Sequence, residues 1–184
     1  MKKLLAIISA AALTSVAAAD VTVDLAGIYS MNGAGDAENT VLSFDVGAGM
    51  NVIGISYSDV SGMGIDADGA DGGPSWGNEM RTLVSNSASE GVNWGYFPAE
   101  GSGSAGGPWS ADDASYDLVA LELDFVTGDD GLVFVEFYEG YNDHAGADAM
   151  YTSGSLTIHT AAIPAPGAIA LLGVAGLATR RRRK

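Results

Sequence analysis

The chain has 184 residues and no cysteine, so it has room for one domain and cannot stabilise that domain with a disulfide bond. Its formal charge is −15, but its basic residues are concentrated at the two ends. Between residues 20 and 162, Arg81 is the only basic residue against 23 acidic ones, a formal charge of about −22. Such a surface repels nucleic-acid phosphates and anionic lipids, which excludes a nucleic-acid-binding function. It favours solubility outside the cell, divalent cations or basic partners.

Residues 1–19 have the three parts of a secretory signal peptide. Two lysines precede an apolar stretch, and small residues follow it, with Ala17 and Ala19 at the positions that a signal peptidase reads. The apolar stretch is short for a membrane span, so we expect the export machinery to deliver the chain and cleavage to occur before Asp20. The alternative is an uncleaved membrane anchor.

Residues 20–162 show the period-2 alternation of β-strands and no sustained helical period. Gly, Asp and Asn clusters separate the runs and predict turns. The sequence therefore predicts an all-β domain, an antiparallel β-sandwich with long Gly/Asp-rich loops over about 58–78 and 86–116. The expected strands are Val21–Leu25, Val41–Val46, Val52–Tyr57, Met80–Ser85, Leu118–Phe125, Leu132–Tyr138 and Leu156–His159.

The first long loop contains alternating aspartates, Asp66, Asp68 and Asp71, in a glycine-rich segment. Carboxylates spaced in this way can turn several oxygens toward one hard cation, and Ca²⁺ takes six to eight oxygen ligands. The spacing does not match an EF-hand, because alanine occupies the fifth position and aspartate the glycine position. The segment predicts either a calcium site or a solvated acidic turn.

Three tryptophans, Trp76, Trp94 and Trp109, fall in segments that the sequence predicts to be loops. Exposed aromatic rings suit the faces of sugar rings, which makes them candidate stacking residues for a carbohydrate. The alternative is that these rings fold back and cover the sandwich core, because aromatic side chains usually bury their large surface.

Recognisable catalytic arrangements are missing from the sequence. It contains no Gly-x-Ser-x-Gly elbow, no His-Glu-x-x-His helix and no phosphate-binding loop. Acidic pairs such as Asp112–Asp113 could serve a glycosidase only at a carboxyl separation that sequence does not give. We therefore expect no enzyme, no catalytic residues and no certain cofactor.

Residues 163–184 form a module of their own. Pro164 and Pro166 break any preceding element, an uncharged stretch of small and branched residues follows over 167–179, and basic residues end the chain. As a helix, the span from residue 163 to 179 would reach about 25 Å, slightly less than the roughly 30 Å hydrocarbon core. The basic end consists of Arg180, Arg181, Arg182, Arg183 and Lys184. It is expected to stay cytoplasmic, with the domain outside the inner membrane.

This tail resembles the PEP-CTERM sorting signal that exosortases recognise. Pro164 and Pro166 match the two prolines of that motif, and Ala165 stands where the usual motif has Glu. The resemblance implies transient anchoring in the inner membrane, then cleavage near the motif by an exosortase-like enzyme, either a standard one or a variant that accepts Pro-Ala-Pro. Composition and layout of the core are also reminiscent of exported jelly-roll and lectin-like sandwiches, without a shared motif.

The sequence thus predicts an exported, C-terminally sorted protein of the cell surface or extracellular matrix. Its parts are a signal peptide (1–19), an acidic β-sandwich (20–162) and a sorting tail (163–184). In the resembling class, such proteins are associated with exopolysaccharide-rich biofilm. The alternatives are a carbohydrate-binding module that binds extracellular polysaccharide, with or without calcium, and a glycan-active enzyme.

Overall fold

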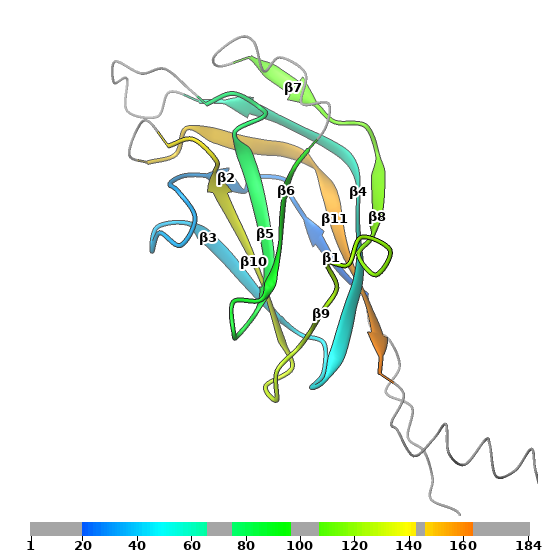
Figure 1. Ribbon diagram of the computed structural model, residues 1–184. Helices are drawn as coiled ribbons and strands as arrows, with labels where there is room; N and C mark the ends of the chain where they lie inside the picture. Colours follow the sequence, from blue (N-terminus) through cyan, green and yellow to red (C-terminus); the bar gives the residue numbers. More distant parts are fainter. Residues whose placement is uncertain (1–19, 66–74, 97–106, 143–145, 164–184) are drawn as a thin grey trace, which may run out of the picture.

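The computed structural model describes residues 20–65, 75–96, 107–142 and 146–163, and these residues form two packed antiparallel sheets (Figure 1). The prediction of an all-β sandwich is therefore confirmed. The first sheet contains β1 (Val21–Asp24), β2 (Tyr29–Ser30), β4 (Met50–Gly64), β7 (Pro108–Ser110), β8 (Ala114–Asp117), β9 (Phe125–Val126) and β11 (Ala149–Ala162). The second contains β3 (Thr40–Asp45), β5 (Met80–Asn86), β6 (Gly91–Gly95) and β10 (Leu132–Glu139).

The first sheet is built around two long strands, β4 and β11, which pair antiparallel along almost their whole length. On the other side of β11 lie β1 and β2, and on the other side of β4 lie β7, β8 and β9 in succession. The second sheet has the order β3-β10-β5-β6. Figure 1 shows the two sheets facing each other.

The core lies between the sheets and is filled by alternate residues of the facing strands, as period-2 patterning requires. The second sheet contributes Val84, Val133, Val135 and Phe137, and the first contributes Val52, Ile55, Tyr57, Leu156 and Ile158, all with at most 3% exposure. An aromatic cluster fills one part of this core, with Tyr96, Trp109, Tyr151 and Phe137 in stacked or edge contacts. Burial raises the pKa of both Tyr96 and Tyr151.

Six of the seven expected strands coincide with observed strands, but the two central ones are much longer than expected. The predicted strand Val52–Tyr57 is part of β4, and Leu156–His159 is part of β11. Both extensions run through Ser- and Gly-rich sequence that reads as loop. Register shifts between Tyr151 and Ser155 let these strands bend while they stay paired.

The predicted strand Leu118–Phe125 is wrong: residues 118–124 form a compact turn. The Asp117 carboxylate accepts a hydrogen bond from the Ala120 amide at 3.0 Å, as at the start of a helix. Glu122 has φ 58°, and the Leu123 amide donates to the Leu118 carbonyl at 2.8 Å, which closes the turn as at a helix end. The alternating residues Val119, Leu121 and Leu123 are consequently about half exposed.

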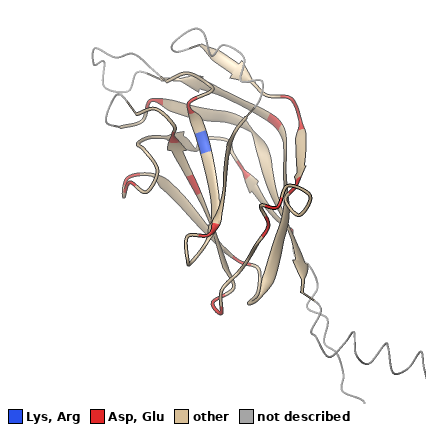
Figure 2. Cartoon of the chain, viewed as in Figure 1, with Lys and Arg blue, Asp and Glu red and all other residues tan. Residues whose placement is uncertain are grey.

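Both flanking helices expected from the sequence, the signal helix and the apolar helix of the tail, lie outside the described residues. Within the described ranges, no helix is long and apolar enough to cross a membrane. Arg81, the basic residue between positions 20 and 162, lies on β5. Figure 2 shows acidic residues spread over many strands and loops around it.

Gly154 lies at an irregularity of β11, and we expect Gly154→Ala to destabilise the domain by about 1–3 kcal/mol. Its φ is +113°, and a Cβ there would lie 2.6 Å from the Val60 Cα, so the backbone and the packing both oppose alanine. Gly33→Ala is the control, because a Cβ there meets nothing within 4 Å. Urea unfolding measures both; equal stability of the two variants would contradict this packing.

Candidate functional site

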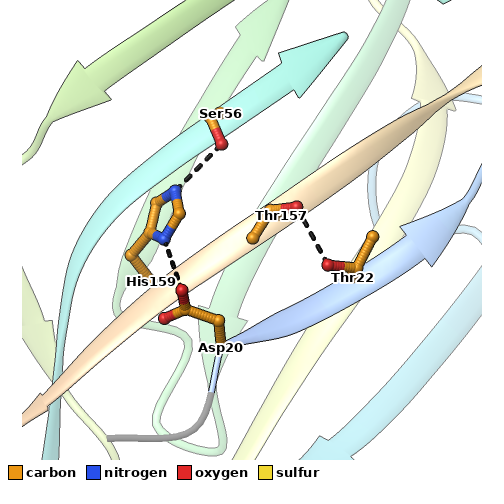
Figure 3. Close-up of polar contacts among 5 residues, drawn as sticks. All are labelled: Asp20, Thr22, Ser56, Thr157 and His159. Atoms are coloured by element: carbon orange, nitrogen blue, oxygen red, sulfur yellow. Dashed lines mark hydrogen bonds and ion pairs between the residues drawn. The ribbon is translucent and has the colours of Figure 1, made fainter.

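A polar cluster links the first described residue of the chain to the last strand (Figure 3). β1 and β11 pair antiparallel with Val21 opposite Ile158, which places Asp20 beside His159. The Asp20 Oδ2 lies 3.0 Å from the His159 Nδ1, although 139 positions separate the two residues in the chain. On the other side of the ring, the His159 Nε2 lies 2.9 Å from the Ser56 Oγ on β4.

Hydrogen-bond chemistry fixes the direction of these contacts. An ionised carboxylate only accepts, so the His159 Nδ1–H donates to Asp20. In the neutral ring, Nε2 then accepts the hydrogen bond that the Ser56 hydroxyl donates. The side chains of Asp20 and His159 are 53% and 33% exposed, so the cluster is open to solvent.

Two neighbouring features border the cluster. Thr22 and Thr157 share a hydroxyl hydrogen bond of 3.0 Å, which ties β1 to β11 two residues from each partner of the ion pair (Figure 3). Gly54 is the β4 partner of His159, and a Cβ there would lie 3.5 Å from the ring carbon Cδ2. The imidazole thus lies beside Gly54 and reaches Ser56 on the same strand.

The hydrogen-bonded series Ser56, His159 and Asp20 has the same residue types, in the same order of contact, as the nucleophile, base and orienting carboxylate of a catalytic triad. Acyl transfer also needs donors for the developing oxyanion, most often backbone amides. Ser56 has a partner strand on each side, with Thr157 on β11 and Ser115 on β8. Ser56 thus lies inside the sheet, between β11 and β8.

The sandwich has two junctions with the segments that are expected to be removed: Asp20, after the signal peptide, and Ala162, before the tail. Both lie at the same end of the sandwich. β11 ends at Ala162, three residues after His159, so the start of the C-terminal tail is about 10 Å along the strand from the polar cluster. The start of β1 and the end of β11 lie at the same end of the sandwich (Figure 1). The two places where the sequence predicts processing are therefore adjacent in space.

Most of the residues that the sequence marks as sites lie outside the described ranges. These are Ala17 and Ala19 of the signal, the motif Pro164, Ala165 and Pro166 with the terminal arginines, and the proposed calcium ligands Asp66, Asp68 and Asp71. Of the cleavage residues, Asp20 is described and belongs to the polar cluster. Among the described residues, no three His, Cys, Asp or Glu side chains gather into a metal-binding group.

The three tryptophans have different environments. Trp109 on β7 is 3% exposed and packs in the core, stacked on Tyr96 at 6.3 Å between ring centroids. Trp94 on β6 is partly buried and lines a largely apolar cleft of about 130 Å³ together with Tyr116 and Leu121. Trp76 is 43% exposed. Of the three rings, Trp76 therefore offers the most accessible face for stacking on a ligand.

Trp76 lies at the opposite end of the sandwich from the polar cluster. The Ser75 amide donates to the carbonyl of Asp148, which directly precedes β11, whereas His159 is near the end of that strand. Eleven residues of chain lead from Asp148 to His159, about 36 Å measured along β11. A turn holds the tryptophan, because the Trp76 amide donates to the Glu79 carboxylate at 2.8 Å.

Comparisons with known proteins identify no family for this chain. No protein-family model matches, and no curated protein matches. Among solved structures, the VP2 subviral particle of infectious bursal disease virus matches at TM-score 0.34 and 12% identity, over 90% of this chain and 39% of that one. The coat protein dimer of Tobacco streak virus matches at TM-score 0.24 and 10% identity, over 80% and 90%. Likenesses at this level carry no argument about function.

Proposed function

We propose that this chain is an exported and C-terminally sorted protein of the cell surface or extracellular matrix, with a non-catalytic acidic sandwich as its mature part. Signal peptidase removes residues 1–19, and an exosortase-like enzyme processes the tail that begins at residue 163. The sandwich then remains outside the inner membrane. The observation that supports this proposal best is the adjacency of the two junctions, at Asp20 and Ala162.

Adjacent junctions matter because both processing reactions occur at the inner membrane. A domain that has its N- and C-terminal residues on the same side can fold completely while either terminal segment is still inserted in the inner membrane. The tail is then a temporary anchor, since an apolar helix of about 25 Å is slightly short for the roughly 30 Å hydrocarbon core. The charge of about −22 keeps the released domain soluble and repels other copies.

We further propose that the sandwich is jelly-roll-like. Its support is the way the chain alternates between the sheets: β3 lies in the second sheet, β4 in the first, and β5 and β6 in the second again. After β7, β8 and β9 the chain crosses once more to β10 and returns to β11. Such repeated crossing is typical of Greek-key sandwiches.

A carbohydrate-binding function is the second candidate, and the exposure of Trp76 supports it. This ring lies at the end of the domain that faces away from the two junctions, where an anchored protein would meet extracellular polysaccharide. Loss of glycan-array binding in Trp76→Ala would support this function; unchanged glycan binding would contradict a role for that ring.

The sorting proposal is tested by changing the two prolines of the tail. We expect the double variant Pro164→Ala and Pro166→Ala to stay in the inner-membrane fraction with its tail attached, because the sorting enzyme no longer recognises it. The host must carry an exosortase gene, ideally beside polysaccharide-synthesis genes. Cell fractionation and mass spectrometry measure the outcome, with Pro108→Ala as the control outside the tail. A double variant with the location and mass of the wild type would contradict sorting through this motif.

A further inference from the structure

The contact between Asp20 and His159 brings together two atoms that are both good metal ligands. A carboxylate oxygen and an imidazole nitrogen bind divalent transition metals at about 2.0–2.1 Å. Two such ligands at right angles on one ion are separated by about 2.8–3.0 Å, from the same bond lengths. The Asp20 Oδ2 and the His159 Nδ1 lie 3.0 Å apart. An ion can therefore bind both atoms at their observed separation once the imidazole turns its Nδ1 off the direct line to the carboxylate oxygen.

A third ligand comes from the main chain once the signal peptide is gone. In the precursor the Asp20 nitrogen is a peptide amide, which does not bind metals in its protonated form. Cleavage after Ala19 turns it into a free α-amine with a lone pair. This amine and the Asp20 carboxylate can close a chelate ring through Cα, Cβ and Cγ on the ion that His159 holds.

Ser56 supplies the support that metal-binding histidines usually have. When Nδ1 binds an ion, the ring proton moves to Nε2, which then donates to the Ser56 Oγ at the observed 2.9 Å. The Thr22–Thr157 hydrogen bond keeps the start of β1 against β11, so the chelating residue stays in reach of the ring. The arrangement thus has ligands, an orienting hydroxyl and a fixed strand pair.

We propose that the mature N-terminus is a copper(II) site, formed by the α-amine and carboxylate of Asp20 and the Nδ1 of His159, with Ser56 as a positioning residue. Two nitrogens and one oxygen suit the tetragonal geometry of Cu²⁺, and Cu²⁺ binds such donors more tightly than Zn²⁺ or the other divalent first-row metals. The strongly negative domain raises the local concentration of cations. This inference rests on the proposed export and on cleavage before Asp20.

The test uses the protein exported from the full chain and purified after processing. N-terminal sequencing comes first and shows whether the chain begins at Asp20. Addition of Cu²⁺ alone, followed by calorimetry and electron paramagnetic resonance, is expected to show one ion per chain coupled to two nitrogens. A chain that begins at Asp20 but binds Cu²⁺ no better than His159→Ala would overturn the inference and leave the export proposal intact. A different first residue would overturn the proposed cleavage and the copper site with it.

The sequence offers a selective way to block the amine. Residues 20–162 contain no lysine, so an amine-acetylating reagent modifies only the Asp20 α-amine once the tail has been removed. Acetylation is expected to remove one nitrogen coupling and to weaken binding, and unchanged binding would overturn the role of the amine. His144→Ala, which changes the other histidine of the chain, is the matched control and should bind as the wild type does.

Ser56 is tested separately because it acts through His159. Ser56→Ala is expected to weaken Cu²⁺ binding about 10–100-fold while both nitrogen couplings remain, which is the usual effect of losing an orienting partner. Ser56→Thr keeps the hydroxyl and should restore binding. Equal affinities of the alanine, threonine and wild-type proteins would contradict the positioning role.

Discussion

Replacement of Trp109 by alanine is expected to lower the free energy of unfolding by about 3–5 kcal/mol, the range for a large buried aromatic residue. Its ring is 3% exposed, stacks on Tyr96 and meets the edge of Tyr151 at 6.1 Å between centroids. It also covers Gly62 and Gly77, where a Cβ would lie within 2.6 Å of the indole. Removal of the ring leaves a cavity that these glycines cannot fill.

Trp76→Ala is the matched control for this prediction. Its ring is 43% exposed, so we expect a change within about 0.5 kcal/mol. Urea unfolding of both proteins, followed by circular dichroism, measures the difference. Equal destabilisation by the two substitutions would contradict the assignment of Trp109 to the core and of Trp76 to the surface.

Deletion of residues 163–184 is expected to remove the membrane-bound precursor and to place all of the protein in the soluble exported fraction. Without the apolar stretch and its basic end, nothing holds the chain at the membrane for the sorting enzyme. The sandwich itself should be unaffected, because its last strand ends at Ala162. Fractionation followed by immunoblotting measures the change.

Pro108→Ala serves again as the control for location, because its tail is intact. We expect it to distribute between fractions as the wild type does. Envelope association of the deleted chain at wild-type level would contradict sorting by the tail and would assign the attachment to the sandwich.

The fold class could be predicted from the sequence because its strongest strands alternate over whole elements. β10 is the clearest example: Leu132–Tyr138 was expected and Leu132–Glu139 is observed. The prediction of Leu118–Phe125 failed because the same alternation also arises in a short helical turn. Two local features favour the turn over the strand. The Asp117 side chain caps the start of the turn, and Glu122 adopts a positive φ at its end.

The lengths of β4 and β11 could not be predicted because their outer parts are rich in serine and glycine. These residues have low strand propensity, yet two strands that pair over their full length stabilise each other regardless of local preference. The short strands β7, β8 and β9 were missed for a related reason. Each has four residues or fewer and exists only because β4 offers an edge to pair with.

The polar cluster could be predicted only in part. The sequence marks Asp20 as the residue after the expected cleavage site and predicts His159 at the end of a strand, but no pattern in it points to Ser56. The three residues meet because β1, β11 and β4 are neighbours in one sheet, and this order depends on contacts across more than 100 positions of the chain. The burial of Trp109 is also a tertiary effect, since the sequence left open whether that ring binds a ligand or covers the core.

Under the proposed function, both ends of the chain are removed and the sandwich between them is the working form. Intact-mass spectrometry of the protein from its own cell envelope or medium, combined with N-terminal sequencing, tests it most directly. We expect a chain that begins at Asp20 and ends close to Pro166, with a mass well below the 18.6 kDa of the full sequence. A protein that keeps residues 1–19 or 167–184 in its final location would contradict it.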